Sequence, residues 1–292
     1  MRVRLATCQI LPEPDPDAAP LDAALAAAGV DATWLAWDDP EAPWDEPVPT
    51  VLRSTWNYVR HPDAFAAWLD RVAAAAPVFN PPAVIRGNIH KRYLLDLAGR
   101  GVPVVPTALV ARGTTPSVQA LAASRGWTGR LVVKPAVGAG SFGCQVFAAD
   151  DHAGAEIHAA AIAAAGDVLI QPYQASVDAH GERSLVWIDG ALSHQVRKSP
   201  RFAGEVERVT GPYPIADDER AVAMAALAVV ADAAAPASLL YGRVDLARDD
   251  DDRPIVMELE LAEPSLFFAL GAEARAVERF VAGLCRRLGA TA

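Results

Sequence analysis

The chain has few cysteines, no long uncharged apolar run and no excess of basic residues. Its 292 residues include Cys8, Cys144 and Cys285, which are too widely spaced for a zinc motif or a disulfide framework. No stretch of about 18 apolar residues is free of charge, and the apolar part of the N-terminus is too short for a signal peptide. We therefore expect a cytoplasmic protein without a membrane partner.

Basic charge is scarce as well. The sequence has 26 Lys and Arg residues against 36 Asp and Glu residues, which gives a formal net charge of −10. Proteins that bind nucleic acid usually present a broad basic face, so we expect no nucleic-acid partner. The net charge still allows a small anion in a locally positive cleft. With 52% hydrophobic residues, many of them alanine, the chain is globular and long enough for two or three lobes.

Motifs for a side-chain nucleophile are also missing. The sequence contains no G-x-S-x-G, its six histidines include no H-x-x-x-H pair, and Cys144 has no evident catalytic base near it in the sequence. This pattern agrees with chemistry that depends on positioning and charge neutralisation.

Three carboxylates near the C-terminus are the most informative feature present. The acidic run 249–252 predicts the turn of a β-hairpin, with Asp245 on one strand and Glu258 and Glu260 on one face of the other. Folding the hairpin would bring Asp245 opposite the two glutamates. Close carboxylates repel by about 4 kcal/mol per pair at an effective dielectric of about 20. A hard divalent cation such as Mg²⁺ removes that cost. The alternative is a solvated acidic hairpin.

Apolar periodicity predicts the elements around this hairpin. The N-terminal part reads as an α/β unit, in which Phe65, Trp68, Leu69 and Val72 share one face of a helix. The expected strands cover 3–8, 33–37, 131–135, 144–148, 168–172, 183–188 and 191–197. The other expected helices end at Gly29, begin at Lys91, begin at Thr115-Pro116, and cover 217–234 and 272–288.

A glycine-rich segment, KPAVGAGSFGCQV, lies between two predicted strands at 134–146. Its glycines free the backbone to bring N–H groups close to phosphate oxygens, and Lys134 immediately precedes it. The segment is neither a P-loop nor a Rossmann turn, because a strand follows it. Taken alone it also fits a mobile loop without a ligand. The bend VLIQPYQ at 168–174 could likewise bind an adenine edge or be an ordinary strand end.

Taken in order along the chain, the glycine-rich segment, the bend and the acidic hairpin resemble the ATP-grasp superfamily. In that superfamily the nucleotide lies between two α+β lobes. The resemblance covers about residues 80–270. It implies an α+β ATP-grasp fold with three lobes at 1–88, 89–174 and 175–292, and it implies ATP and Mg²⁺ as cofactors. The implied metal ligands are Asp245, Glu258 and Glu260, where Glu260 replaces the usual asparagine. The implied nucleotide-binding residues are Lys91, Lys134, Gly138, Gly140, Ser141, Phe142, Gly143, Gln171, Pro172, Tyr173 and Asp178.

The segment VLIQPYQASVDAHGERSLVWIDG is similar to bacterial glutathione synthetases and ribosomal-protein glutamate ligases. The similarity implies that Asp178 contacts the ribose and that Arg183 faces the reacting phosphoryl and carboxylate groups. Lys198 stands where these relatives place a basic residue near the transferred phosphate. Arg183 and Lys198 are therefore the expected catalytic residues.

Two further motifs, RSTWNY at 53–58 and ELELAEPSLF at 258–267, resemble a smaller branch. That branch is similar to the O-ureido-serine cyclo-ligases that close D-cycloserine, which implies a small-molecule amino acid substrate. On the substrate side of the pocket we expect Arg53, Ser54 and Thr55, because a guanidinium and two hydroxyls can bind a substrate carboxylate. Ser265 is expected either to contact substrate or to cap a helix.

The resemblance implies that ATP phosphorylates a carboxylate and that a nitrogen of the same molecule then displaces phosphate. Two alternatives stay open at this point. One is a ligase that joins an amino acid or peptide to a separate amine, and the other is a nucleotide-binding regulatory protein without turnover. The sequence leaves the oligomeric state open, with a homo-oligomer among the options.

Overall fold

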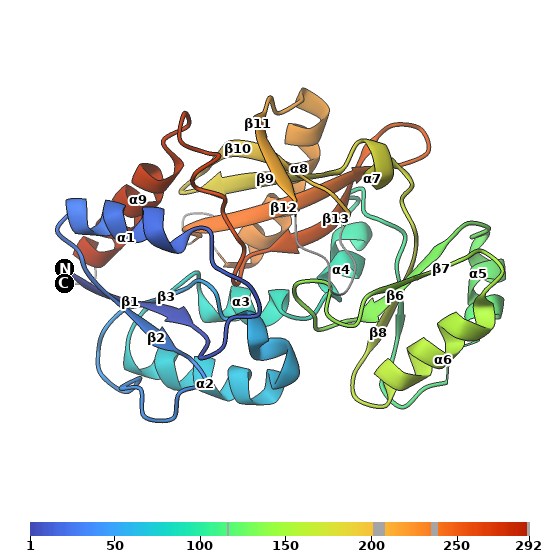
Figure 1. Cartoon of the computed structure of the whole chain (residues 1–292), viewed down its shortest axis with the longest axis horizontal. Coiled ribbons are helices and arrows are strands. Elements are labelled where there is room, and N and C mark those ends of the chain that lie inside the picture. The colour runs from blue at the N-terminus through green and yellow to red at the C-terminus, as the bar shows by residue number, and fades with distance from the viewer. Residues whose placement is uncertain (116, 201–207, 235–238, 291–292) are drawn as a thin grey trace.

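The computed structural model describes residues 1–115, 117–200, 208–234 and 239–290, and within these ranges the strands form three sheets (Figure 1). The N-terminal sheet is parallel, with strand order β2-β1-β3-β4. The central sheet is antiparallel, with order β5-β8-β6-β7. The C-terminal sheet is also antiparallel, with order β11-β10-β9-β12-β13. Sheets of both kinds with helices packed on them confirm the expected α+β class.

The strands are β1 (Arg2–Thr7), β2 (Asp31–Ala36), β3 (Thr50–Leu52), β4 (Val78–Phe79), β5 (Ala108–Val110), β6 (Leu131–Pro135), β7 (Gln145–Phe147), β8 (Val168–Pro172), β9 (Glu182–Ile188), β10 (Ala191–Lys198), β11 (Val209–Tyr213), β12 (Tyr241–Arg248) and β13 (Pro254–Glu260). The helices are α1 (Ala18–Ala27), the short 3-10 helix η1 (Trp56–Arg60), α2 (Pro62–Ala75), α3 (Pro82–Asn88), α4 (Tyr93–Gly99), α5 (Val118–Arg125), α6 (His152–Ala163), α7 (Ser176–Ala179), α8 (Asp217–Ala234) and α9 (Ala276–Ala290).

The predicted strands are confirmed, and the helices differ mainly at their ends. α4 begins at Tyr93, so Lys91 lies in the turn before it rather than at its first residue. α5 is capped by Ser117, whose hydroxyl accepts a hydrogen bond from the N–H of Ala120, and not by Thr115. The predicted first-turn residue Pro116 lies outside the described residues. All four apolar residues expected on the inner face of α2 are buried.

The C-terminal hairpin forms as the sequence predicts. β12 and β13 pair antiparallel, and Asp245 lies directly across the ladder from Glu258. Arg243, two residues earlier on β12, lies across from Glu260. Because side chains two apart on a strand share a face, these residues occupy one side of the hairpin. That side carries charge, whereas Val244, Leu246 and Leu259 on the other side are buried in the core.

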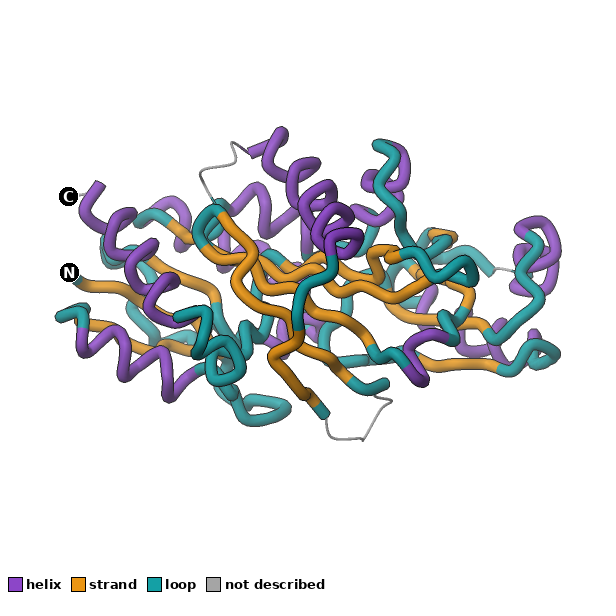
Figure 2. Tube along the Cα trace, turned by 90° about the horizontal axis from the view of Figure 1, so that it is seen from above, coloured by secondary structure: helices purple, strands orange, loops and turns teal. Residues whose placement is uncertain are grey.

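The N-terminal and C-terminal lobes share a core, while the central lobe has its own. Leu21 and Leu25 of α1 pack in the same apolar cluster as Tyr241 of β12 and Phe280 of α9. The central sheet instead packs against α5 and α6 in a separate cluster. Both chain ends accordingly lie close together at the end of the molecule farthest from the central lobe (Figures 1 and 2).

The lobe boundaries at 88 and 174 stay a prediction. One observation bears on the first of them: Leu94 and Leu97 of α4 pack with Val244 and Leu259 of the C-terminal sheet. Among the described residues, no helix combines the length and apolar character that a membrane crossing requires.

Candidate active site

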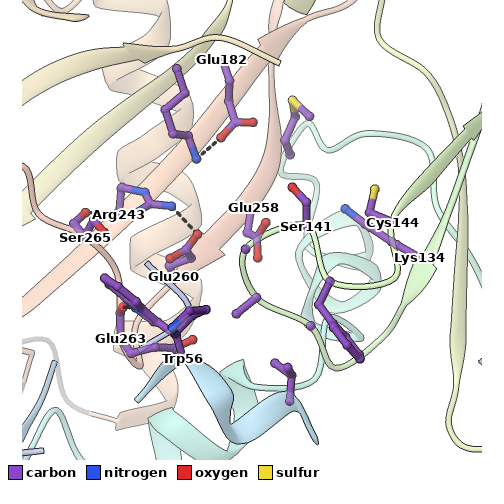
Figure 3. A pocket seen from close by; sticks show the side chains of 18 of the residues that line it. Trp56, Lys134, Ser141, Cys144, Glu182, Arg243, Glu258, Glu260, Glu263 and Ser265 are labelled. Atoms are coloured by element: carbon purple, nitrogen blue, oxygen red, sulfur yellow. Dashed lines mark hydrogen bonds and ion pairs between the residues drawn. The ribbon is translucent and has the colours of Figure 1, made fainter. Parts of the chain in front are cut away.

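A cleft of about 1420 Å³ lies between the three lobes. The glycine-rich loop and the β8 bend close it on the side of the central lobe, and η1 borders it on the N-terminal side (Figure 3). The inner face of β13 contributes Glu258 and Glu260. Of the nucleotide-binding residues expected from the sequence, those that line the cleft are Lys91, Lys134, Gly138, Gly140, Ser141, Phe142, Gly143, Gln171, Pro172 and Tyr173.

The glycine-rich loop is folded over the cleft and is held from two lobes. Gly143 has a φ of +66°, and a Cβ atom there would come within 2.9 Å of the Pro135 ring, so only glycine fits without a shift. The carbonyl of Gly143 lies 2.8 Å from a ring nitrogen of His158 on α6. On the other side, the Arg60 guanidinium lies 5.2 Å from the ring centroid of Phe142. The loop tip thus contacts the N-terminal lobe.

Two acids on β13 face the cleft, and each is paired with a cation of the chain. The Lys91 ammonium pairs with Glu258 and also donates to the carbonyl of Gly138 over 2.7 Å. The Arg243 guanidinium pairs with Glu260 (Figure 3). Among the described residues no carboxylate lies within ion-pair distance of Lys134, which leaves that ammonium available for an anion in the cleft.

Asp245 is the most deeply buried acid of the three. Its carboxylate accepts from Lys198 over 2.7 Å and from both Nε and Nη2 of Arg243 over 2.9 Å. It is fully buried and does not line the cleft. All three acids are thus paired with cations of the chain, and the described residues contain no group of three His, Cys, Asp or Glu side chains placed to hold a metal ion. The three acids as one metal-binding set stay a prediction.

The pKa of each acid is set by its burial and by the cations paired with it. Burial favours the neutral form of Asp245, but Arg243 and Lys198 outweigh it and hold its pKa well below the ordinary range. Burial also opposes ionisation of Glu258, and Lys91 and Lys134 again prevail, so its pKa is lowered. For Glu260, burial outweighs the attraction of Arg243 and raises the pKa to about 7. The cleft therefore holds carboxylates of differing basicity on one strand face.

The structure does not bring Arg183 into the cleft. Side chains alternate along β9, and Glu182, one residue earlier, faces the cleft and pairs with Lys198. Arg183 lies on the other face, where its guanidinium is 4.5 Å from the ring centroid of Tyr213 and its Nε donates to His180 over 3.2 Å. Lys198, the other expected catalytic residue, does line the cleft.

Arg53, Ser54 and Thr55 are buried beneath the cleft instead of lining it. Arg53 pairs with Asp17 over 3.3 Å and lies against the rings of Tyr241 and Phe280. The Ser54 hydroxyl is 2.9 Å from that of Thr7, and the Thr55 hydroxyl has no hydrogen-bond partner among the described residues. Arg53 also donates to the carbonyl of Pro264 and so joins the N-terminal and C-terminal lobes, while a contact of the three residues with substrate stays a prediction. Ser265 does line the cleft, and no helix begins at it.

Asp178 is the remaining residue that the structure does not bring into the cleft. Its carboxylate accepts from the hydroxyl of Tyr173 and, over 2.7 Å, from Arg130. Burial and the bond to Asp178 raise the pKa of Tyr173 to about 12. The Asp178 side chain is half exposed and its oxygens can accept further hydrogen bonds, so a ribose contact by Asp178 stays a prediction.

Among the cleft-lining residues that sequence reasoning missed are Glu182, Arg243 and Glu263. A signal for Arg243 was present, because a residue two before Asp245 on a predicted strand shares its face. Glu182 could have been found only by fixing which face of β9 turns inward. Glu263 follows the end of β13, so strand alternation gives no indication of where it points.

Three lobes around a cleft, with a glycine-rich loop above a carboxylate-bearing hairpin, define the ATP-grasp fold. A solved structure of the ATP-grasp ligase PsnB with a phosphomimetic variant of its minimal precursor, Mg and ADP superposes with a TM-score of 0.63, at 19% identity and over 98% of each chain.

A narrower family is also shown. Residues 3–80 match the model of the N-terminal domain of D-cycloserine synthetase DcsG. The cycloserine biosynthesis protein DcsG of Streptomyces lavendulae is 37% identical over 284 residues, which is 94% of either chain. A crystal structure of D-cycloserine synthetase DcsG superposes with a TM-score of 0.91, at 34% identity over 99% of this chain and 100% of that one. The chain belongs to the DcsG family of ATP-grasp ligases, and it is an ATP-dependent ligase.

Proposed function

We propose that the enzyme uses ATP to cyclise O-ureido-D-serine to D-cycloserine. The observation that carries this proposal is the relative in cycloserine biosynthesis, which is 37% identical over 94% of the chain. Similarity over such a length includes both the nucleotide side of the cleft and the η1 side that borders the substrate. The geometry agrees, because the cleft brings cations, carboxylates and backbone donors together without a side-chain nucleophile.

The residues in the cleft fit a magnesium ion bound together with the nucleotide. Mg²⁺ in such sites uses one or two carboxylates plus phosphate oxygens, and Glu258 and Glu260 supply two carboxylates on one strand face. Asp245 could join them only after losing a bond to Arg243 or Lys198. When bound, Mg²⁺ neutralises charge on the β- and γ-phosphates and polarises the transferred phosphoryl group.

The chain's own cations have separable roles in this proposal. Lys134 is free to bind phosphate, and Lys91 can exchange Glu258 for a phosphate oxygen when the nucleotide enters. Lys198 and Arg243 are fixed by Asp245, so their charges stay in place near the substrate carboxylate. Preorganised charge of this kind stabilises the transition state without reorganisation during the reaction.

Cyclisation then requires a nitrogen of the ureido group to attack its own acyl carbon. The C–N bond forms as the bond from the acyl carbon to the phosphate oxygen breaks, the nitrogen loses its proton, and phosphate leaves. Water then cleaves the bond between that nitrogen and the carbamoyl carbon, and the carbamoyl group leaves as carbon dioxide and ammonia. Folding of the 138–143 loop over the cleft keeps water from the acyl phosphate. Holding both reacting ends in one molecule makes the step unimolecular and favours ring closure over hydrolysis.

The test supplies O-ureido-D-serine, ATP and Mg²⁺ to the purified enzyme with no other amine. We expect D-cycloserine, identified by mass spectrometry, together with ADP and phosphate in equal amounts. ADP release that requires a separate amine would overturn cyclisation in favour of an intermolecular ligase. Nucleotide binding with no ADP release across a panel of amino acids would contradict turnover altogether.

The same proposal covers partners and location. A small amino acid derivative and ATP account for the cleft, and a net charge of −10 is unfavourable to nucleic-acid binding. We propose that the enzyme acts in the cytoplasm.

A further inference from the structure

Glu263 differs from the other buried acids of the cleft. Its side chain turns into the cleft beside Trp56 (Figure 3), and the residue is only 8% exposed. Glu182, Glu258 and Glu260 each pair with a lysine or arginine. Among the residues that the structure describes, no cation lies within ion-pair distance of Glu263. A buried carboxylate is thus left without the compensating charge that its neighbours have.

The backbone on both sides of Glu263 is fixed by the N-terminal lobe. The indole N–H of Trp56 donates to the carbonyl of Glu263 over 2.9 Å, and Arg53 donates to that of Pro264 over 3.0 Å. The carboxylate of Asp17 accepts from the N–H groups of Leu266 and, over 2.9 Å, Phe268. These hydrogen bonds join the two motifs at 53–58 and 258–267. They fix the backbone that carries the Glu263 side chain.

One buried hydroxyl acts on the carboxylate. The hydroxyl belongs to Tyr58, on η1, and it favours the ionised form of Glu263. Burial above all, with the charge of Glu260, raises the pKa of Glu263 to about 8. The ionised form of Glu263 is therefore costly, and a positively charged ligand group would remove that cost.

We propose that Glu263 binds the α-ammonium group of the amino acid substrate. This assignment rests on the proposed function, in which the substrate carboxylate is activated near Lys198 and Arg243. Arg243 pairs with Glu260, and the charge of Glu260 acts on Glu263. Cationic and anionic groups are therefore neighbours on this side of the cleft. An α-amino acid carries its own two charges in the complementary order. Glu263 is then the residue that selects amino acids over other carboxylic acids.

The experiment compares O-ureido-D-serine with 3-(ureidooxy)propanoic acid, which lacks only the α-amino group. We expect the wild type to prefer the amino compound in kcat/KM by on the order of 10- to 100-fold, the range for a hydrogen bond to a charged group. Glu263→Gln should lose most of that preference through a higher KM for the amino compound alone. Glu263→Asp should recover part of it, and Glu273→Gln, an exposed acid in the same segment, should keep it.

The outcomes separate this assignment from the proposed function. If Glu263→Gln lowers kcat equally for both compounds, Glu263 acts in the chemical step or in folding, and the ammonium assignment is wrong. If the wild type makes no cycloserine, cyclisation fails, and ADP release is measured instead with a panel of amino acids and their desamino counterparts. A wild type that uses or binds the two classes equally, or binds no amino acid, overturns the assignment there as well.

Discussion

Two buried ionic clusters in this protein have similar chemistry and differ in their surroundings. One contains Asp245, Arg243 and Lys198 and lies at the edge of the cleft. The other contains Arg53 and Asp17 and is sealed between the N-terminal and C-terminal lobes, with both side chains 1% exposed. In each, a guanidinium meets a buried carboxylate. Only the first continues into acids and lysines that line the cleft.

The difference shows how a charged motif can serve a site without touching its ligand. Arg53 has the chemistry of a carboxylate binder, but it is buried, and its Nη2 already donates to Asp17 and to the carbonyl of Pro264. Its contribution to the cleft is indirect, through the backbone that carries Glu263. At the cleft edge, by contrast, the pairs of Glu258 and Glu260 can open to a nucleotide. Four measurements would sharpen or break this distinction.

The largest expected effect is on folding. Asp17→Asn leaves the Arg53 charge buried without a counter-charge, and we expect the free energy of unfolding to fall by about 3–5 kcal/mol. Denaturant unfolding measures it. Asp31→Asn, which removes an exposed acid 3.8 Å from Arg2, should cost about 0–1 kcal/mol. A normal stability together with a raised substrate KM for Asp17→Asn would instead make Arg53 part of the binding site.

The next effect is on turnover. Glu258→Gln removes one of the two carboxylates that β13 presents to the cleft, and we expect kcat to fall by about 100- to 1000-fold, the scale of losing one preorganised electrostatic group. The variant should stay folded, as judged by circular dichroism and its melting temperature. Asp251→Asn, at the exposed turn of the same hairpin, serves as the control and should keep kcat. Unchanged turnover in Glu258→Gln would remove the proposed metal site.

A smaller effect concerns pH and the stability of the nucleotide-free protein. The folded-state pKa of Glu263 is raised to about 8, so the folded protein holds a proton that the unfolded chain releases near pH 4.5. Stability from this group is therefore present at low pH and falls as pH rises towards 8. Relative to wild type, Glu263→Gln should differ little at pH 5 and gain about 3–4 kcal/mol at pH 8.

Unfolding midpoints in urea at both pH values measure this difference. Glu273→Gln, which changes an exposed acid, should show the same pH dependence as wild type. A loss of stability in Glu263→Gln at pH 8 would mean that the carboxylate has a cationic partner in the folded protein.

The smallest effect is at the loop tip. Phe142→Ala removes the ring beside Arg60, and a contact of this kind is worth about 0.5–1 kcal/mol at an exposed site. We expect a two- to fivefold rise, roughly, in the ratio of ATP hydrolysed to product formed, because the loop excludes water less well. Ile157→Ala, an exposed apolar residue of the same lobe, should leave the ratio unchanged. An unaltered ratio in Phe142→Ala would separate the loop from the N-terminal lobe.

Much of the fold could be predicted from local pattern. The strands of the central and C-terminal lobes, the inner face of α2 and the acidic hairpin follow from short-range periodicity and turn chemistry. Lys134 and the glycine-rich loop were likewise found from their order along the chain. Helix ends were less predictable, since Ser117 and not Thr115 caps α5.

The sequence by itself determined which side chains share a strand face, because alternation is a local property of the backbone. It therefore placed Glu258 beside Glu260 and could have placed Arg243 beside Asp245. Only the folded chain shows which face of β9 turns inward, that Asp17 neutralises Arg53, and that no cation among the described residues pairs with Glu263. Those outcomes depend on contacts between residues as far apart as Asp17 and Leu266, which no local pattern encodes.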